Sequence, residues 1–83
     1  MEIDNLLGER EHKYGDFSLK ATTIQWLKEI ARRDAGWSSL PNDQKEAIDM
    51  IFTKIGRILT GKHTYKDNWT DIKGYARLVE ERL

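Results

Sequence analysis

Apolar residues recur at intervals of three and four along most of the chain, and no other feature of the sequence constrains the fold as strongly. This spacing is the period of an α-helix with one apolar side. β-branched residues never alternate with polar ones over the length of a strand, and the chain contains a single proline. We therefore expect an all-α fold, a compact single-domain bundle of three to four helices over about residues 2–13, 17–35, 41–60 and 68–83.

Three of the predicted helices carry an apolar stripe that we expect to form the core. The stripe of 17–35 comprises Phe17, Ala21, Ile24, Leu27, Ile30 and Ala31. The stripe of 41–60 comprises Ile48, Ile51, Phe52, Ile55, Ile58 and Leu59, and that of 68–83 comprises Trp69, Ile72, Ala76, Val79 and Leu83. Because the connections between them are short, consecutive helices should pack antiparallel.

Several residues mark the expected helix ends. Asp16 or Ser18 can cap the N-terminus of helix 17–35, and Gly36 is placed to close it in a left-handed conformation. Pro41 suits the first turn of the next helix, and Asp67 is a candidate cap for the last one.

Gly56 and Gly74 lie inside predicted helices, where each costs about 1 kcal/mol relative to alanine. A missing Cβ lets two helices approach closely, so we expect helices 41–60 and 68–83 to cross at these points. The alternative is that a ligand or a partner chain approaches the backbone there.

The composition excludes several classes of protein. With 83 residues and no cysteine, the chain has a thin stability margin and no disulfide, which favours a homo-oligomer. The 14 basic and 14 acidic side chains balance, so nucleic acid is not an expected partner. No apolar run can span a bilayer, and the first residues lack the pattern of a secretion signal. We therefore expect a cytoplasmic protein with no membrane partner.

Charged and aromatic residues gather on one side of the last two predicted helices. Lys54 and Arg57 are three residues apart, and Asp67, Asp71 and Tyr75 follow one another at intervals of four. One interpretation is a salt-bridge network that fixes the register of the two helices. The other is a cleft in which the two cations bind phosphate oxygens while the carboxylates hold a divalent ion or a base.

Two further residues complete the candidate ligand-binding set: Arg10, a third cation that can donate hydrogen bonds to phosphate oxygens, and Tyr14, a ring that can stack on a base. His63, Asp67 and Asp71 are weak candidates for a metal site, since His63 precedes the predicted helix start, and we expect none. The sequence identifies no cofactor and no catalytic residue.

The strings REHKYGDF, KIGRIL and HTYKDNWTDIKGYARLVEERL resemble the signature of a family of small phage and prophage proteins of unknown function. The resemblance runs from residue 10 to the end of the chain. Its most specific part falls on Asp71, Ile72, Gly74, Tyr75 and Ala76. It implies an all-α, phage-encoded protein of the host cytoplasm with a loose link to nucleotides.

The chain is also faintly similar to the MazG-like all-α nucleotide pyrophosphohydrolases, which bind magnesium through acidic motifs on adjacent helices. It departs from them because Lys54 and Arg57 stand where paired carboxylates would be needed, which leaves Asp67 and Asp71 as the acids opposite. Two carboxylates are too few for magnesium-assisted hydrolysis, so we favour binding over catalysis.

Three functional hypotheses remain. The first is a homo-oligomer that binds a nucleotide-like or otherwise phosphorylated ligand in a cleft between subunits. The second is a protein-interaction module that inhibits a host enzyme or defence factor through exposed aromatic residues such as Trp37, Tyr65 and Trp69. The third is a minimal metal-dependent pyrophosphohydrolase that uses Asp67 and Asp71. We rank the first slightly above the second.

Overall fold

The computed structural model describes residues 16–83, which form three α-helices and one short 3₁₀-helix. These elements are α2 (Phe17–Arg33), η1 (Trp37–Ser39), α3 (Asn42–Thr60) and α4 (Lys66–Glu80). No strand occurs among the described residues, and the all-α prediction is confirmed. The predicted helix over 2–13 lies outside the part of the chain that the structure describes.

The start of α2 follows the sequence prediction and its end does not. The Oδ1 atom of Asp16 accepts a hydrogen bond from the Leu19 amide at 2.9 Å, which is the expected N-cap. The helix ends at Arg33, and Gly36 has φ −65°, so the left-handed closure predicted for Gly36 was wrong. The reason is local: the Asp34 carboxylate accepts the Gly36 amide at 2.8 Å and turns the chain into η1.

The later helices begin close to their predicted positions. Pro41 directly precedes α3, with φ −67°. The helix α4 starts at Lys66, so Asp67 lies in its first turn and is not the predicted cap. The Asp67 carboxylate instead accepts a hydrogen bond from the Tyr65 hydroxyl at 3.0 Å. A carboxylate in the first turn still interacts favourably with the helix dipole.

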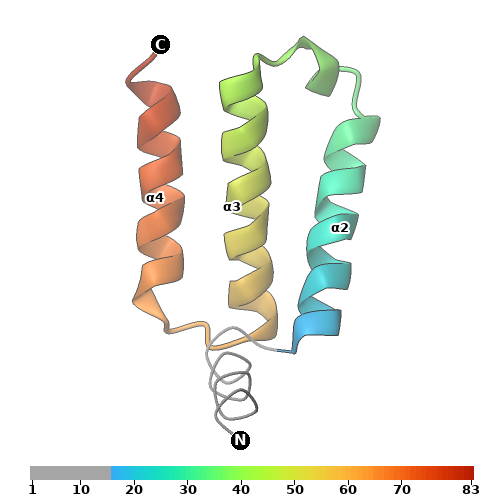
Figure 1. Cartoon of the computed structure of the whole chain (residues 1–83), viewed down its shortest axis with the longest axis vertical. Helices are drawn as coiled ribbons and strands as arrows, with labels where there is room; N and C mark the ends of the chain where they lie inside the picture. The colour runs from blue at the N-terminus through green and yellow to red at the C-terminus, as the bar shows by residue number, and fades with distance from the viewer. Residues whose placement is uncertain (1–15) are drawn as a thin grey trace, which may run out of the picture.

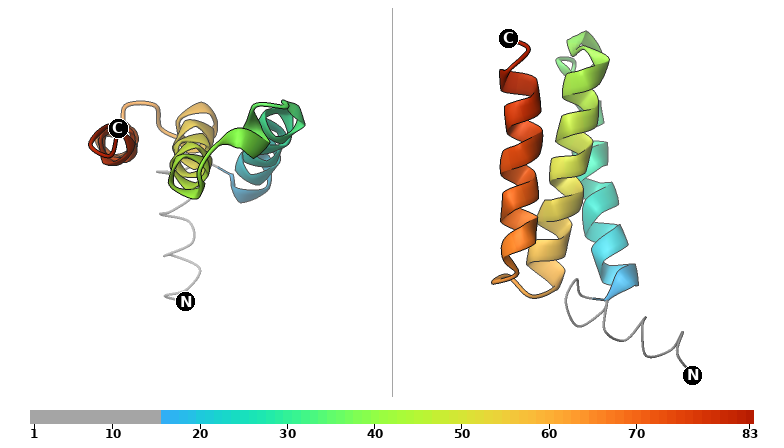
Figure 2. Two further views of the ribbon diagram at one scale, coloured as in Figure 1. Left: turned by 90° about the horizontal axis from the view of Figure 1, so that it is seen from above. Right: turned by 60° about the vertical axis from the view of Figure 1, so that its left-hand side comes forward.

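The three helices lie side by side in one layer with α3 in the middle (Figure 1). Consecutive helices run antiparallel, as expected. Both α2 and α4 pack against α3 and make little contact with each other, and the view from above shows the three helices in a row (Figure 2). None of the helices among residues 16–83 is long and apolar enough to cross a membrane.

Two contacts fix the rotation of α3 within this layer. Gly56 faces the Ile24 side chain of α2, and Lys54 forms an ion pair with Asp71 of α4. Residues 54 and 56 are separated by about 200° around a helix, so α2 and α4 flank α3 on nearly opposite sides. The apolar stripe of α3 is centred near Ile55, roughly a right angle from both contacts. It therefore points out of the layer and not at a neighbouring helix.

The helical period also places the apolar residues of α2 and α4, which run antiparallel to α3. They lie on the same side of the layer as the α3 stripe. We call this side the apolar face. It consists of Leu19, Trp26, Leu27 and Ile30 on α2, Ile48, Ile51, Phe52, Ile55 and Leu59 on α3, and Trp69, Ile72, Ala76 and Val79 on α4. The opposite side, the polar face, consists of Gln25, Lys28, Arg32, Thr53, Arg57, Thr70, Asp71, Gly74 and Leu78.

This arrangement overturns most of the predicted core. Ile24 and Ala47 are the only buried apolar side chains among the described residues. The α3 stripe from Ile48 to Leu59 contains no fully buried member, and Leu59 is 66% exposed. Stripe residues of the other helices are also largely exposed, among them Phe17, Ile30, Trp69 and Leu83. The stripes exist as predicted, but a single layer of helices leaves one side of each without a neighbour.

Candidate functional site

A buried ion pair joins the two helices that carry the predicted site. The Nζ atom of Lys54 on α3 lies 3.0 Å from Oδ2 of Asp71 on α4. The Lys54 side chain is 10% exposed and the Asp71 side chain 45% exposed. The cation is therefore enclosed between the helices, while its partner carboxylate reaches the surface. Both residues belong to the site predicted from the sequence, and the structure brings them into contact.

Asn68, which the candidate set did not include, lies in the same α3–α4 contact. Its side chain is fully buried, with 1% of the residue surface exposed, and its amide Nδ2 has no hydrogen-bond partner. An unsatisfied buried amide costs about 1–3 kcal/mol. The signal in the sequence was the spacing of Asn68, Asp71 and Tyr75, which puts a polar line on the side of α4 that faces α3.

A surface depression of about 390 Å³ opens beside the ion pair. It is lined by Thr70, Asp71, Gly74, Tyr75 and Leu78, all on α4. A Cβ on Gly74 would meet no atom within 4 Å, so the predicted close helix crossing is absent there. Gly56 does mark a close contact, but with α2 and not with α4 as predicted: a Cβ there would approach the Ile24 side chain to 2.3 Å. Packing among the described residues therefore explains Gly56 and leaves Gly74 unexplained.

The other predicted site residues are more scattered. Arg57 is half-buried, one turn beyond Lys54 on α3, and lies on the polar face. Asp67 is exposed at the start of α4 and is held by Tyr65. Arg10 and Tyr14 lie outside the described residues.

The weak metal candidates do not converge. The His63 backbone carbonyl accepts a hydrogen bond from the Trp69 indole at 3.2 Å, and the His63 residue is exposed in the loop. Within residues 16–83, no group of three or more His, Cys, Asp or Glu side chains is placed to hold a metal ion. His63, Asp67 and Asp71 are therefore not brought together among the described residues.

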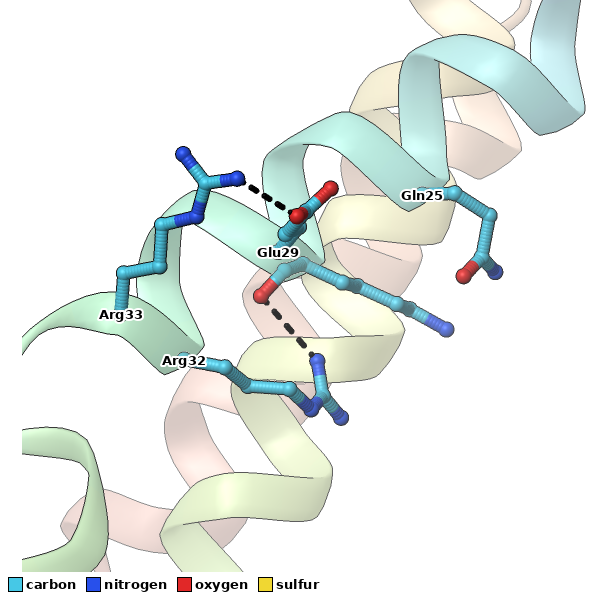
Figure 3. Close-up of a pocket in the computed structure, with 5 residues that line it drawn as sticks. Gln25, Glu29, Arg32 and Arg33 are labelled. Carbon is cyan, nitrogen blue, oxygen red and sulfur yellow. Dashed lines mark hydrogen bonds and ion pairs between the residues drawn. The ribbon is translucent and has the colours of Figure 1, made fainter.

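A larger open depression, about 650 Å³, lies along α2 and was not predicted from the sequence. Figure 3 shows Gln25, Glu29, Arg32 and Arg33 around it. Its two arginines are engaged within the chain: Arg33 pairs with Glu29 at 2.7 Å, and Arg32 pairs with Asp49 at 2.8 Å. Arg32 also lies over the Trp37 ring, 4.9 Å from its centroid. These cations stabilise α2 and its connection to α3, so we assign no ligand to them.

Comparison with known proteins identifies the family. Residues 3–83 match the family described as Domain of unknown function (DUF6378), which covers nearly the whole chain. The chain belongs to this family. Membership in DUF6378 agrees with the expected resemblance to a family of unknown function. Neither a curated protein nor a solved structure matches the chain.

In this DUF6378 domain, the Lys54–Asp71 pair combines a hydrogen-bond donor with an acceptor. A lysine ammonium has three N–H donors, and Asp71 accepts from one side of it. The half-exposed Asp71 carboxylate can accept further hydrogen bonds from the depression. Together they offer donors for anionic oxygens and an acceptor for hydroxyl or amino groups, beside the Tyr75 ring. This is the chemistry that a phosphorylated, ring-containing ligand requires.

Proposed function

We propose that the protein is a homo-oligomeric binder of a nucleotide-like or otherwise phosphorylated ligand, and that it acts as a small accessory protein of the phage type in the host cytoplasm. The ligand occupies the polar face at the α3–α4 contact. Lys54 and Arg57 bind its phosphate oxygens, Asp71 accepts from its hydroxyl or amino groups, and Tyr75 contacts its ring. The phage-type part of the proposal rests on the sequence resemblance alone.

The observation that carries the proposal is the enclosed Lys54 ammonium, 3.0 Å from a carboxylate that reaches the surface. Removing an ammonium group from water is expensive, and a well-packed apolar residue of similar volume is often equally stable at such a position. In addition, α4 presents Asn68 and Asp71 to α3 while its tryptophan, Trp69, stays 55% exposed. The polar residues Asn68 and Asp71 thus occupy a helix contact that Trp69 could have filled. Such a departure from apolar packing is typical of a functional site.

Gly74 adds a second, independent support. A helix glycine costs about 1 kcal/mol relative to alanine, and no neighbour within 4 Å requires it here. Gly74 lines the depression together with Asp71 and Tyr75. A ligand that lies against the backbone of α4 would explain why this position lacks a side chain.

Thermal unfolding with a panel of phosphorylated probes tests the proposal. The panel comprises inorganic pyrophosphate and nucleoside mono-, di- and triphosphates, each at millimolar concentration. A probe present at 100 times its Kd stabilises the folded state by about 2.7 kcal/mol, which raises the Tm of a domain of this size by roughly 10–20 °C. We expect at least one nucleotide to do so for the wild-type protein.

Two lysine variants locate the binding site. Lys54→Met removes the ammonium group and keeps the volume, so the nucleotide shift should disappear. Lys73→Met makes the same change at an exposed position on nearly the opposite side of α4 from Asp71, so the shift should remain. The proposal is wrong if no probe shifts the wild-type Tm, or if Lys54→Met responds as strongly as Lys73→Met.

A second candidate function, an interaction module that inhibits a host protein, is favoured by the exposed apolar face. Trp26 and Trp69 are 66% and 55% exposed on it, and tryptophan is the residue type most enriched at binding hot spots. This function requires the face to be accessible in the purified protein. It competes directly with self-association through the same surface.

A further inference from the structure

The apolar face is too large to be left open in a stable soluble protein. Its most exposed members are Leu19, Trp26, Ile30, Leu59 and Trp69, at 55–67% of their full exposure. Monomeric soluble proteins rarely expose contiguous apolar patches larger than a few hundred Å². With two buried apolar side chains among residues 16–83, the layer also lacks the core that normally stabilises a domain. Another surface must cover this face.

We propose that a second copy of the chain covers it, so that two three-helix layers pack with their apolar faces together. This assigns a surface to the homo-oligomer of the proposed function and does not depend on which ligand binds. It also revises the expected cleft between subunits, because it turns the two polar faces outward. Each Lys54–Asp71 pair then lies on the outside of the dimer, within one subunit.

The available area matches what a dimer needs. From their exposed fractions, the strongly exposed side chains of the face offer roughly 650 Å² per chain, and the half-buried residues of the α3 stripe add to this area. A stable protein–protein interface buries about 800 Å² per partner. The face alone therefore supplies an interface of standard size.

The distribution of charge also favours a second copy. Between Ile48 and Leu59, the part of α3 that points out of the layer carries no charged residue, and charges such as Lys73 and Glu80 lie at the edge of the α4 stripe. An apolar centre with a polar rim is the usual composition of an interface. In a two-fold dimer the same surface of both chains meets, so this surface must be complementary to itself. An uncharged surface meets this requirement because no like charges oppose each other across the axis.

The symmetry predicts which residues meet. Because α3 is the middle helix of the layer, the two copies of α3 lie across the axis from each other. Ile55 is at the centre of the α3 stripe, so the two Ile55 side chains lie nearest the axis. Leu78, which is 50% exposed on the polar face, stays far from the partner.

A matched pair of leucine variants tests the assignment by light scattering coupled to size-exclusion chromatography. The wild-type protein at about 50 µM should show twice the chain mass of 9.7 kDa. Leu59→Glu puts two unpaired charges into the interface and should give the mass of a single chain, with weaker helical circular dichroism because the separated layer has only two buried apolar side chains among residues 16–83. Leu78→Glu makes the same change on the polar face and should leave the dimer intact.

Crosslinking tests the same interface without introducing a charged residue into it. The chain has no cysteine, so Ile55→Cys and Leu78→Cys each introduce a single thiol. A short bis-maleimide should join two Ile55→Cys chains in high yield and leave Leu78→Cys chains separate.

A monomeric wild-type protein would overturn the proposal, and the apolar face would then be covered by another segment or another protein. A dimer that Leu78→Glu disrupts and Leu59→Glu does not would overturn it equally, and so would crosslinking of Leu78→Cys alone. A wild-type protein that is a dimer but binds no nucleotide would instead refute only the ligand part of the proposed function.

Discussion

The side chain of Ile24 lies directly against Gly56, so close that a Cβ on Gly56 would come within 2.3 Å of Ile24 Cγ1. This contact sets the distance between α2 and α3. The clash involves the inner part of a buried side chain, which cannot move away without a shift of the helix.

Gly56→Ala should therefore destabilise the protein by about 1–3 kcal/mol, in spite of the higher helix propensity of alanine. Gly74→Ala is the matched control, because nothing lies within 4 Å of its Cβ, and it should stabilise the protein by about 0.5–1 kcal/mol. Urea unfolding of both variants measures the two changes. Equal effects at the two glycines would contradict the contact between Ile24 and Gly56.

The two partners of the buried ion pair should respond unequally to substitution. Asp71→Ala leaves the enclosed Lys54 ammonium without its carboxylate and should cost about 2 kcal/mol, somewhat less than for a fully buried pair because Asp71 is half-exposed. Lys54→Met removes the enclosed charge and leaves a carboxylate that water can reach, so the change should be within about 1 kcal/mol. Urea unfolding distinguishes them, and a larger loss for Lys54→Met would mean that the ion pair is mainly structural.

The cap of α2 should contribute measurably to stability. Asp16→Ala removes the acceptor of the Leu19 amide and should cost about 1 kcal/mol. Asp16→Asn keeps an oxygen in the same place and should cost little, which separates capping from charge. The Tm of the two variants measures this difference, and equal values would argue against the cap.

The helices themselves could be predicted from the sequence, because period and turn residues act locally. The three described helices begin within two residues of their expected starts, and Asp16 caps α2 as expected. The end of α2 was missed because an aspartate side chain, Asp34, bonds the Gly36 amide and stops the helix two residues early. Such competition between side chain and backbone is hard to recognise without the folded geometry.

The packing could not be predicted in the same way. Hydrophobic periodicity identifies which side of a helix is apolar, but not which surface covers it. The stripe around Ile55 was expected to contact other helices of the same chain, and it points out of the layer instead. Asn68 was missed for the same reason, since the apolar Trp69 beside it was the better candidate for burial.

The candidate site could be predicted from the sequence only in part. Lys54 and Asp71 could be paired from helix periodicity and a short connection, and they are in contact at 3.0 Å. Their unequal burial depends on the rotation of α4, which the sequence does not determine. In an internal salt bridge both side chains would be buried. Here Asp71 is half-exposed, so the pair can be reached from the polar face.

Native mass spectrometry of the protein purified gently from its expression host tests the account most directly, because one spectrum reports both the number of subunits and any retained small molecule. We predict a dimer of 9.7 kDa chains that carries a bound mass in the range of a nucleotide on each subunit. A monomer without bound ligand would contradict both the assignment of the apolar face to a second copy and the assignment of the polar face to a phosphorylated ligand.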